Sequence, residues 1–429
     1  MHARTTPGRG GAAAKTFIEN TVACMGEIRR VAMVSMHTSP ADPPGSGDAG
    51  GMNVAIRSTA VELAKRGVRV DLLTRATGRP RILELAPGVT VHELAAGPVG
   101  RLPKERLAEA SDEFGEAVAT LARRAESRYD LIHAHYWRSG IATLPATLEL
   151  GIPLVQTFHT VGAMRNRRLA TGEQAEPEIR LRSETYLANQ SDAVIANSAL
   201  EVSVLIDQVG APAGRVWVVP PGVDAEFFSP VRAISESVMR GRLGVHPERP
   251  IVVVAGRVQP LKGQDLAIRA LASMSGDRPL LVIAGEPTPG AEKYLGRLQE
   301  LASETGVEES VRFTGSLDRE SLADLLAAAS LTLVPSYSET FGLVALESAA
   351  SGTPVIATTA LGQTGAVATG ISGVLMGSRD AAEWGRAITA LLDDPLLLAE
   401  LSASARLHAE GYSWGATAAG LLGIYASLR

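Results

Sequence analysis

The sequence is poor in the features that mark several large classes of protein. Cys24 is its only cysteine, so no disulfide can form within the chain, which is typical of a reducing cytoplasm. No run of about eighteen apolar residues occurs, so we expect no membrane span. The 41 basic and 46 acidic side chains nearly balance, at a net charge of −5. A nucleic-acid-binding protein would be strongly basic, so none is expected as a partner and any anion site must be local.

Two motifs of phosphate and metal chemistry are also missing. No glycine loop ends in G-K-[ST], which excludes a P-loop, and no D-x-D pair occurs to hold a metal. Residues 1–27 carry basic residues, glycine and alanine but no apolar core of a signal peptide. We expect them to form a disordered tail.

What the chain does have is a long alternation of short apolar runs with segments of helical period, which predicts an α/β fold with mostly parallel sheets. Its 429 residues, 45 % of them hydrophobic, suffice for two packed domains. The strands expected are 30–36, 68–74, 89–94, 130–133, 153–158, 192–196 and 216–219, then 250–255, 279–284, 311–313, 331–334 and 354–357.

The alternation breaks at Pro220-Pro221-Gly222 and restarts after Pro230. We therefore predict two doubly wound, Rossmann-like domains at 28–222 and 231–410, and a C-terminal helix within 411–429 that returns to the first domain. Ligands of such sheets bind outside the carboxyl ends of the strands. Two facing sheets would thus create one cleft, and the loops after the strands are where the chemistry is expected.

The stretch GSGDAGG, residues 45–51, has the G-x-G-x-x-G spacing of a dinucleotide site. Eight residues separate it from the preceding strand, however, and the acidic candidate Asp71 lies in the middle of a strand rather than at its end. NAD or FAD is therefore disfavoured. The glycines favour a loop whose bare N–H groups approach another anion at a helix N-terminus. A glycine-rich surface loop without a ligand is the alternative.

In the second half, GRVQPLKG (256–263) follows a strand directly. Arg257 and Lys262 would then point into the cleft, where two fixed cations suit a diphosphate. As isolated charges, they would instead be solvated surface residues.

The stretch SYSETFGLVALE (336–347) places Glu339 in a loop and Glu347 about two turns into the next helix. Carboxylates accept hydrogen bonds from hydroxyls, which suits a sugar or ribose. Glu347 is the only charge in an apolar helix, where a buried unpaired carboxylate is costly. The alternative is a glutamate that reaches solvent.

His133, His135 and His159 are expected to follow strands, but no carboxylate stands at ligand spacing, so a metal site is disfavoured. Structural roles and substrate contacts both remain open for them. Several basic residues could form an anion pocket near these histidines, namely Lys104, Arg165, Arg167, Arg168 and Arg180. Taken singly, each would instead be a solvated surface side chain.

The motifs G-R-x-x-P-x-K-G and E-x-F-G-L-V-x-x-E resemble those of the family 4 retaining glycosyltransferases of the GT-B fold, over nearly the whole chain from Arg30. The segments PGSGDAGGMNV, LLTRAT and YDLIHAHYW are most similar to the mycothiol-pathway group of that family. That resemblance implies a hexosyltransferase moving N-acetylglucosamine from UDP-N-acetylglucosamine to 1D-myo-inositol 3-phosphate. Such an enzyme binds a nucleotide-sugar donor and a small phosphorylated polyol, and related enzymes are often homodimers.

The resemblance also implies roles for individual residues. Arg257, Lys262, His159 and Glu339 would be catalytic. Donor binding would use Gly51, Arg257, Lys262, Glu339, Phe341, Gly342 and Glu347. Acceptor binding would use His37, Asp48, Gly50, Gly51, Met52, Asn53, Lys104, Tyr136, Thr160 and Arg180. No cofactor is required; magnesium is not indicated, although a site built from main-chain carbonyls would leave no mark in the sequence.

The chain departs from the family pattern in two places. The run TTALGQTGAV stands where the family usually has G-G-L-P near the donor sugar and keeps only Gly362 of that motif, and the lysine of H-T-L-A-x-x-K-N becomes Arg165 in HTVGAMRN. Three alternatives remain open. The altered G-G-L-P region favours a paralogous transferase of specialised metabolism with another sugar and another alcohol or thiol. A sucrose-phosphate-synthase-like enzyme would share the fold and the two-glutamate motif, and a non-catalytic nucleotide-binding module is the third.

Overall fold

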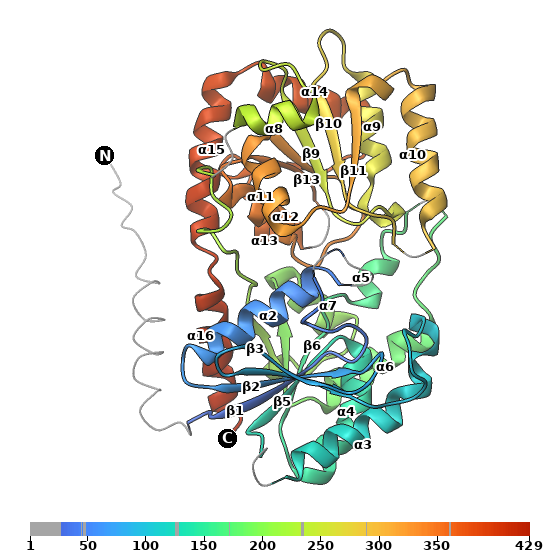
Figure 1. The fold of residues 1–429 in the computed structure, drawn as a ribbon, viewed down its shortest axis with the longest axis vertical. Helices are drawn as coiled ribbons and strands as arrows, with labels where there is room; N and C mark the ends of the chain where they lie inside the picture. The colour runs from blue at the N-terminus through green and yellow to red at the C-terminus, as the bar shows by residue number, and fades with distance from the viewer. Residues whose placement is uncertain are drawn as a thin grey trace, which may run out of the picture.

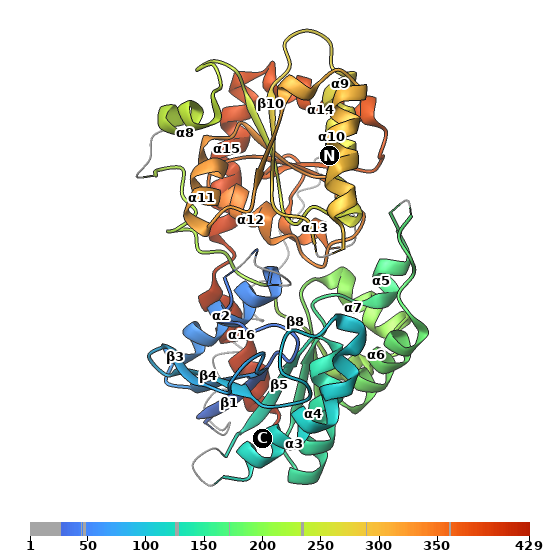
Figure 2. The ribbon, with the colours of Figure 1, turned by 45° about the vertical axis from the view of Figure 1, so that its right-hand side comes forward.

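The computed structural model describes residues 27–43, 45, 49–124, 128–170, 172–232, 236–288, 290–359 and 362–429, except the side chains of residues 104 and 105. The tail expected at residues 1–27 falls outside this part but for its last residue. The described residues form two α/β domains stacked end to end, each with helices on both faces of a sheet (Figures 1 and 2). No helix among them is long and apolar enough to cross a membrane.

The first domain contains an eight-stranded sheet in the order β3-β4-β2-β1-β5-β6-β7-β8. All its neighbouring strands are parallel except β3 and β4, which are antiparallel. The strands are β1 Arg30–Val34, β2 Arg69–Arg75, β3 Ile82–Ala86, β4 Val89–Leu94, β5 Leu131–His135, β6 Leu154–Thr157, β7 Ala193–Ala196 and β8 Val216–Val218. The central strands are buried on both faces, which explains their nearly continuous apolar sequences.

The second domain contains a six-stranded sheet in the order β11-β10-β9-β12-β13-β14, with every pair parallel. Its strands are β9 Ile251–Ala255, β10 Leu280–Ala284, β11 Val311–Gly315, β12 Leu331–Val334, β13 Val355–Thr358 and β14 Gly373–Met376. The expected mostly parallel α/β architecture with two sheets is therefore confirmed.

The helices alternate with these strands. In the first domain they are α2 Gly51–Ala64, α3 Ser111–Ala122, α4 Trp137–Leu150, α5 Gly162–Asn166, α6 Glu178–Gln190 and α7 Ala199–Asp207, with 3-10 turns η2 Lys104–Ala110 and η4 Ala213–Arg215. In the second they are α8 Glu236–Leu243, α9 Gln264–Ser273, α10 Glu292–Glu304, α11 Arg319–Ala328, α12 Leu343–Ala350, α13 Gln363–Ala366, α14 Ala381–Leu392 and α15 Pro395–Glu410, with η5 Pro260–Lys262 and η6 Glu308–Ser310.

The last helix, α16 (Trp414–Ser427), crosses from the second domain back to the first and packs beside α2 (Figure 1). Leu421 and Tyr425 join the core formed by Val31 and Ile56. The chain thus crosses between the domains twice, and the two crossings touch where the N–H of Val223 donates to the carbonyl of Tyr412 over 2.8 Å. This paired crossing is where a hinge between the domains would lie.

Candidate active site

The carboxyl ends of both sheets open into one cavity of about 450 Å³ between the domains. Most of the residues selected from the sequence line it. From the first domain these are His37, Gly50, Gly51, Met52, Tyr136, His159, Thr160 and Arg180; from the second they are Arg257, Lys262, Glu339, Phe341, Gly342 and Glu347. They follow β1, β5, β6, β9 and β12 or begin the next helices, as ligand-binding residues of wound sheets do.

Three selected residues lie elsewhere or cannot be placed. Asn53 is buried, and its side-chain amide donates to Thr38 Oγ1 over 3.0 Å and to the carbonyl of Ser39 over 2.7 Å. Asn53 therefore shapes the loop after β1. Asp48 lies outside the described residues, as does the side chain of Lys104, whose backbone begins η2.

The glycines of the 45–51 stretch bring the two domains close together. A Cβ on Gly51 would lie 3.1 Å from Leu343 Cδ1, and one on Gly45 would lie 2.9 Å from Ser316 Oγ. Both neighbours belong to the second domain. Asp71, the acidic partner that a dinucleotide site would need, is instead held by Arg30 in a 2.7 Å ion pair within the sheet.

The second domain holds its two predicted cations in the segment between β9 and α9. Arg257 follows β9 directly and lines the cavity. Lys262 ends η5, and its Nζ lies 2.5 Å from Glu339 Oε1, which also accepts a 2.8 Å hydrogen bond from Ser336 Oγ. Two of the predicted catalytic groups are therefore in direct contact.

Glu347 is half-buried in the cavity wall, and no described residue forms a hydrogen bond or ion pair with its carboxylate. Burial raises the pKa of Glu347 to about 7, opposed by the charge of Arg319. A carboxyl group poised near neutral pH and without a partner is suited to accept hydrogen bonds from ligand hydroxyls.

The three histidines form one buried cluster. The expectation that His133 and His135 follow the strand is wrong: β5 runs to His135 because its parallel pairing with β6 continues as far as the His135–Thr157 pair. His133 bonds to Tyr425 Oη over 2.6 Å and to Thr157 Oγ1 over 2.8 Å, while His135 Nδ1 lies 2.8 Å from His159 Nε2. Burial lowers the pKa of His133 and of His159 to about 3, so both rings are neutral.

Tyr136 and His159 have left-handed backbone conformations, with φ of 72° and 58°. Such conformations cost about 1–3 kcal/mol in residues other than glycine and are concentrated at functional sites. Both residues line the cavity, and the carbonyl of His159 accepts a hydrogen bond from the Thr340 hydroxyl of the second domain. His159 is thus a point where the two domains meet.

On the first-domain side, Arg180 is almost fully buried beside Thr160 and Tyr136. Its Nη2 donates to the carbonyl of Thr160 over 2.7 Å and to Thr160 Oγ1 over 2.9 Å. Burial alone would lower the pKa of Arg180, but Tyr136 and the carboxylates of Glu184 and Glu176 raise it. This arginine is therefore permanently charged.

Several cavity-lining residues were not selected from the sequence as site residues: Arg165, Asn197, Gln259, Glu286, Ser316, Arg319 and Thr340. Arg165 was named only among the cations of a possible anion pocket and as a departure from the family pattern. Arg319 begins α11 and lies over the rings of Phe227 and Phe228. Single charges at helix starts are common, so nothing in the local sequence distinguishes Arg319.

No group of three histidine, cysteine or acidic residues has a metal-ligating arrangement in the part of the chain that the structure describes. The histidines that could have suggested a metal bind to each other and to hydroxyls instead. Two wound sheets with strand-end cations and carboxylates around a shared cavity have the arrangement of the GT-B fold.

Comparison with known proteins agrees with this class. Residues 49–227 match the family described as Glycosyltransferase Family 4, and residues 236–408 match Glycosyl transferases group 1. The D-inositol 3-phosphate glycosyltransferase of Nocardiopsis dassonvillei is 44% identical over 92% of this chain and 94% of its own length. The enzyme of the same name from Thermobispora bispora is 42% identical over 93% of this chain and 94% of its own length. The solved sucrose-phosphate synthase of Thermosynechococcus elongatus is 31% identical, with a TM-score of 0.86 over 93% of this chain and 99% of that one.

The chain belongs to the family 4 glycosyltransferases and is a hexosyltransferase.

Proposed function

We propose that this enzyme transfers N-acetylglucosamine from UDP-N-acetylglucosamine to 1D-myo-inositol 3-phosphate, with retention of the anomeric configuration. The observation that carries the proposal is the joint lining of one cavity by the two predicted subsites, Arg257 with Lys262 on one side and Thr160 with Arg180 on the other. The two relatives compared above, which match over more than nine-tenths of the chain, are named D-inositol 3-phosphate glycosyltransferases.

In this proposal Arg257 and Lys262 bind the donor diphosphate. As the bond between the anomeric carbon and the diphosphate oxygen breaks, negative charge develops on the leaving group, so both cations bind the transition state more tightly than the ground state. The acceptor hydroxyl attacks from the same face, and its proton passes to the departing phosphate. Of the carboxylates in the cavity, Glu339 is already bound to Lys262 and Ser336, which suits sugar positioning better than nucleophilic attack.

The remaining roles are those that the family resemblance implies, and the cavity lining is consistent with them. The carboxylate of Glu347 accepts hydrogen bonds from the ribose hydroxyls. The carboxylate of Glu339 accepts hydrogen bonds from the sugar hydroxyls, and the backbone N–H groups of Phe341 and Gly342 donate to them. His159 is neutral and contacts the donor sugar from the first domain. The interdomain hydrogen bond from Thr340 to the carbonyl of His159 helps to close the cavity against water. We propose that this reaction needs no cofactor.

A second candidate is a sucrose-phosphate-synthase-like reaction, favoured by the 31% identity to the Thermosynechococcus elongatus enzyme over almost the whole chain. It would pair a glucose donor with a fructose phosphate. Both candidates use a nucleotide sugar and a phosphorylated acceptor, so the same two predicted subsites would serve either.

The test is a matrix of turnover assays in which UDP-N-acetylglucosamine and UDP-glucose are each combined with inositol 3-phosphate and fructose 6-phosphate, with products identified by mass. We expect product from the N-acetylglucosamine and inositol phosphate pair, with the anomeric configuration of the donor in its proton NMR spectrum. EDTA is expected to leave the rate unchanged. Product from the glucose and fructose phosphate pair alone would establish the second candidate, and an inverted anomer would refute front-face transfer.

A further inference from the structure

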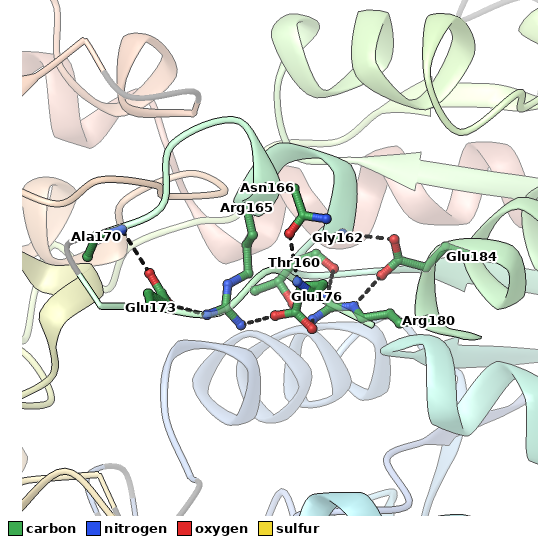
Figure 3. Close-up of polar contacts among 9 residues, drawn as sticks. All are labelled: Thr160, Gly162, Arg165, Asn166, Ala170, Glu173, Glu176, Arg180 and Glu184. Carbon is green, nitrogen blue, oxygen red and sulfur yellow. Dashed lines mark hydrogen bonds and ion pairs between the residues drawn. The ribbon is translucent and has the colours of Figure 1, made fainter. Parts of the chain in front are cut away.

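The carboxylate of Glu176 lies between two arginines of the acceptor side (Figure 3). One of its oxygens pairs with Arg165 Nη1, and the other lies 2.9 Å from Arg180 Nη1. Both arginines line the cavity. An oxyanion bridging two guanidinium groups is the arrangement in which proteins bind phosphate.

The other two carboxylates of this cluster are held by the backbone as well. Glu184 Oε2 accepts from the N–H of Gly162 over 2.8 Å, and Glu173 Oε2 accepts from the N–H of Ala170 over 3.1 Å. The carboxylate of Glu176 is held by the two arginines alone among the described residues, although its own N–H donates to Asn166 Oδ1. Glu176 is therefore the anion of the cluster that can leave with the smallest disruption.

Arg180 has almost no donor capacity left while Glu176 is in place. A guanidinium group has five N–H donors. Nε donates to Glu184 over 2.7 Å, Nη2 donates twice to Thr160, and Nη1 pairs with Glu176. One N–H remains, so a phosphate can be bound by a pair of donors only if Glu176 withdraws.

The charges in the cluster lead to the same conclusion. Two guanidinium groups, Arg165 and Arg180, face three carboxylates, those of Glu173, Glu176 and Glu184 (Figure 3). The side chain of Glu176 is 14% exposed, whereas that of Glu184 is 1% exposed. A dianionic ligand added to this cluster would meet an excess of negative charge, and moving Glu176 toward solvent reduces that excess while returning its carboxylate to water.

We infer that Glu176 occupies the position of the acceptor's phosphate in the ligand-free enzyme and is displaced by it. Glu176 is then a specificity-determining residue. The phosphate of an acceptor replaces its carboxylate between Arg165 and Arg180, whereas a neutral polyol has no anion to pair with the two guanidinium groups. The inference rests on the proposed function, because that function places a phosphate in this pocket.

The test is titration of the full-length enzyme with inorganic phosphate by calorimetry. Replacing Glu176→Gln removes the competing charge and keeps the shape, so we expect phosphate to bind about tenfold more tightly than to wild type, the size of one charged hydrogen bond. Glu176→Asp keeps the charge but shortens its reach, so it cannot bridge both arginines, and we expect an intermediate gain.

The matched control is Glu173→Gln, which changes the net charge equally near Arg165 but removes no bridge to Arg180. We expect its phosphate affinity to stay within about twofold of wild type. Equal gains in Glu173→Gln and Glu176→Gln would show a general charge effect and overturn the inference. Weaker phosphate binding by Glu176→Gln would overturn it too, because Glu176 would then orient the arginines rather than compete.

Kinetics separate this inference from the proposed function. In turnover, Glu176→Gln is expected to lower the KM for inositol 3-phosphate severalfold with little change in kcat. Wild-type enzyme that fails to use inositol 3-phosphate would refute the proposed function. Phosphate binding to the three variants would still report on whether Glu176 competes with an anion.

Discussion

Lys262 Nζ lies 2.5 Å from Glu339 Oε1, so a predicted diphosphate-binding cation is paired with a predicted sugar-binding carboxylate before any donor is present. This ion pair holds both side chains at the cavity wall, and the attraction between the two charges offsets the free-energy cost of removing each from water. A donor that brings a diphosphate to Lys262 and sugar hydroxyls to Glu339 would satisfy both at once. In the proposed mechanism, this one contact would link donor binding to departure of the diphosphate.

Replacing Lys262→Ala should lower kcat by at least about a hundredfold, because a cation that stabilises the leaving diphosphate contributes on the order of 3 kcal/mol to the transition state. Steady-state kinetics at saturating donor measures this. The unfolding midpoint of the variant serves as the control for folding. Unchanged turnover would refute the role of Lys262.

The pH dependence of donor binding should follow Glu347. Its pKa is raised to about 7, so the carboxylate that accepts from ribose forms as the pH rises through 7. The donor KM is therefore expected to fall between pH 6 and pH 8, and Glu347→Gln should remove this dependence. A wild-type KM that is flat over this range would contradict the assignment.

The hydrogen bond from Thr340 to the carbonyl of His159 should favour the closed arrangement of the domains. Thr340→Val keeps the shape and removes the donor, at a cost of about 1 kcal/mol to that arrangement. We expect a larger radius of gyration in small-angle scattering and faster hydrolysis of the donor by water. The matched control is Thr305→Val, because the Thr305 hydroxyl bonds only within its own helix end; the two variants behaving alike would rule out an interdomain role.

The buried histidines should make the protein less stable in acid. Burial holds the pKa of His135 well below its usual value, so the unfolded chain binds a proton below pH 6.5 that the folded chain does not. This contribution to stability is present above pH 6.5 and is lost as the pH falls. Denaturant unfolding at pH 7 and pH 5 measures it. Between these two pH values the free energy of unfolding should fall less in His135→Gln than in wild type, and the difference should be at most about 1.4 kcal/mol per pH unit. Equal losses would mean that His135 is protonated in the folded protein.

Most of the fold could be predicted because the buried strands of parallel sheets have continuous apolar sequences. Two strands, both at sheet edges, were missed. β3 (Ile82–Ala86) is an exposed antiparallel edge strand, with Ile82 70% exposed, so burial leaves little pattern in its sequence. β14 (Gly373–Met376) is a short edge strand that begins at a glycine.

The site was harder to predict where it depends on tertiary pairing. Position after a strand was enough to select Arg257 and Lys262, whereas His159 was selected only through the family resemblance. It could not show that Glu176 bridges Arg165 and Arg180, because those partners are brought together by the loop between α5 and α6. Nor could it show that Gln363, in the altered G-G-L-P segment, is fully buried with both side-chain amide atoms unpaired.

A crystal structure of the enzyme with bound UDP-N-acetylglucosamine tests the central claim most directly, since everything above depends on where the diphosphate lies. We predict its oxygens within hydrogen-bonding distance of both Arg257 and Lys262, with the sugar between Glu339 and His159. A diphosphate held on the glycines of residues 45–51, away from both cations, would contradict the account.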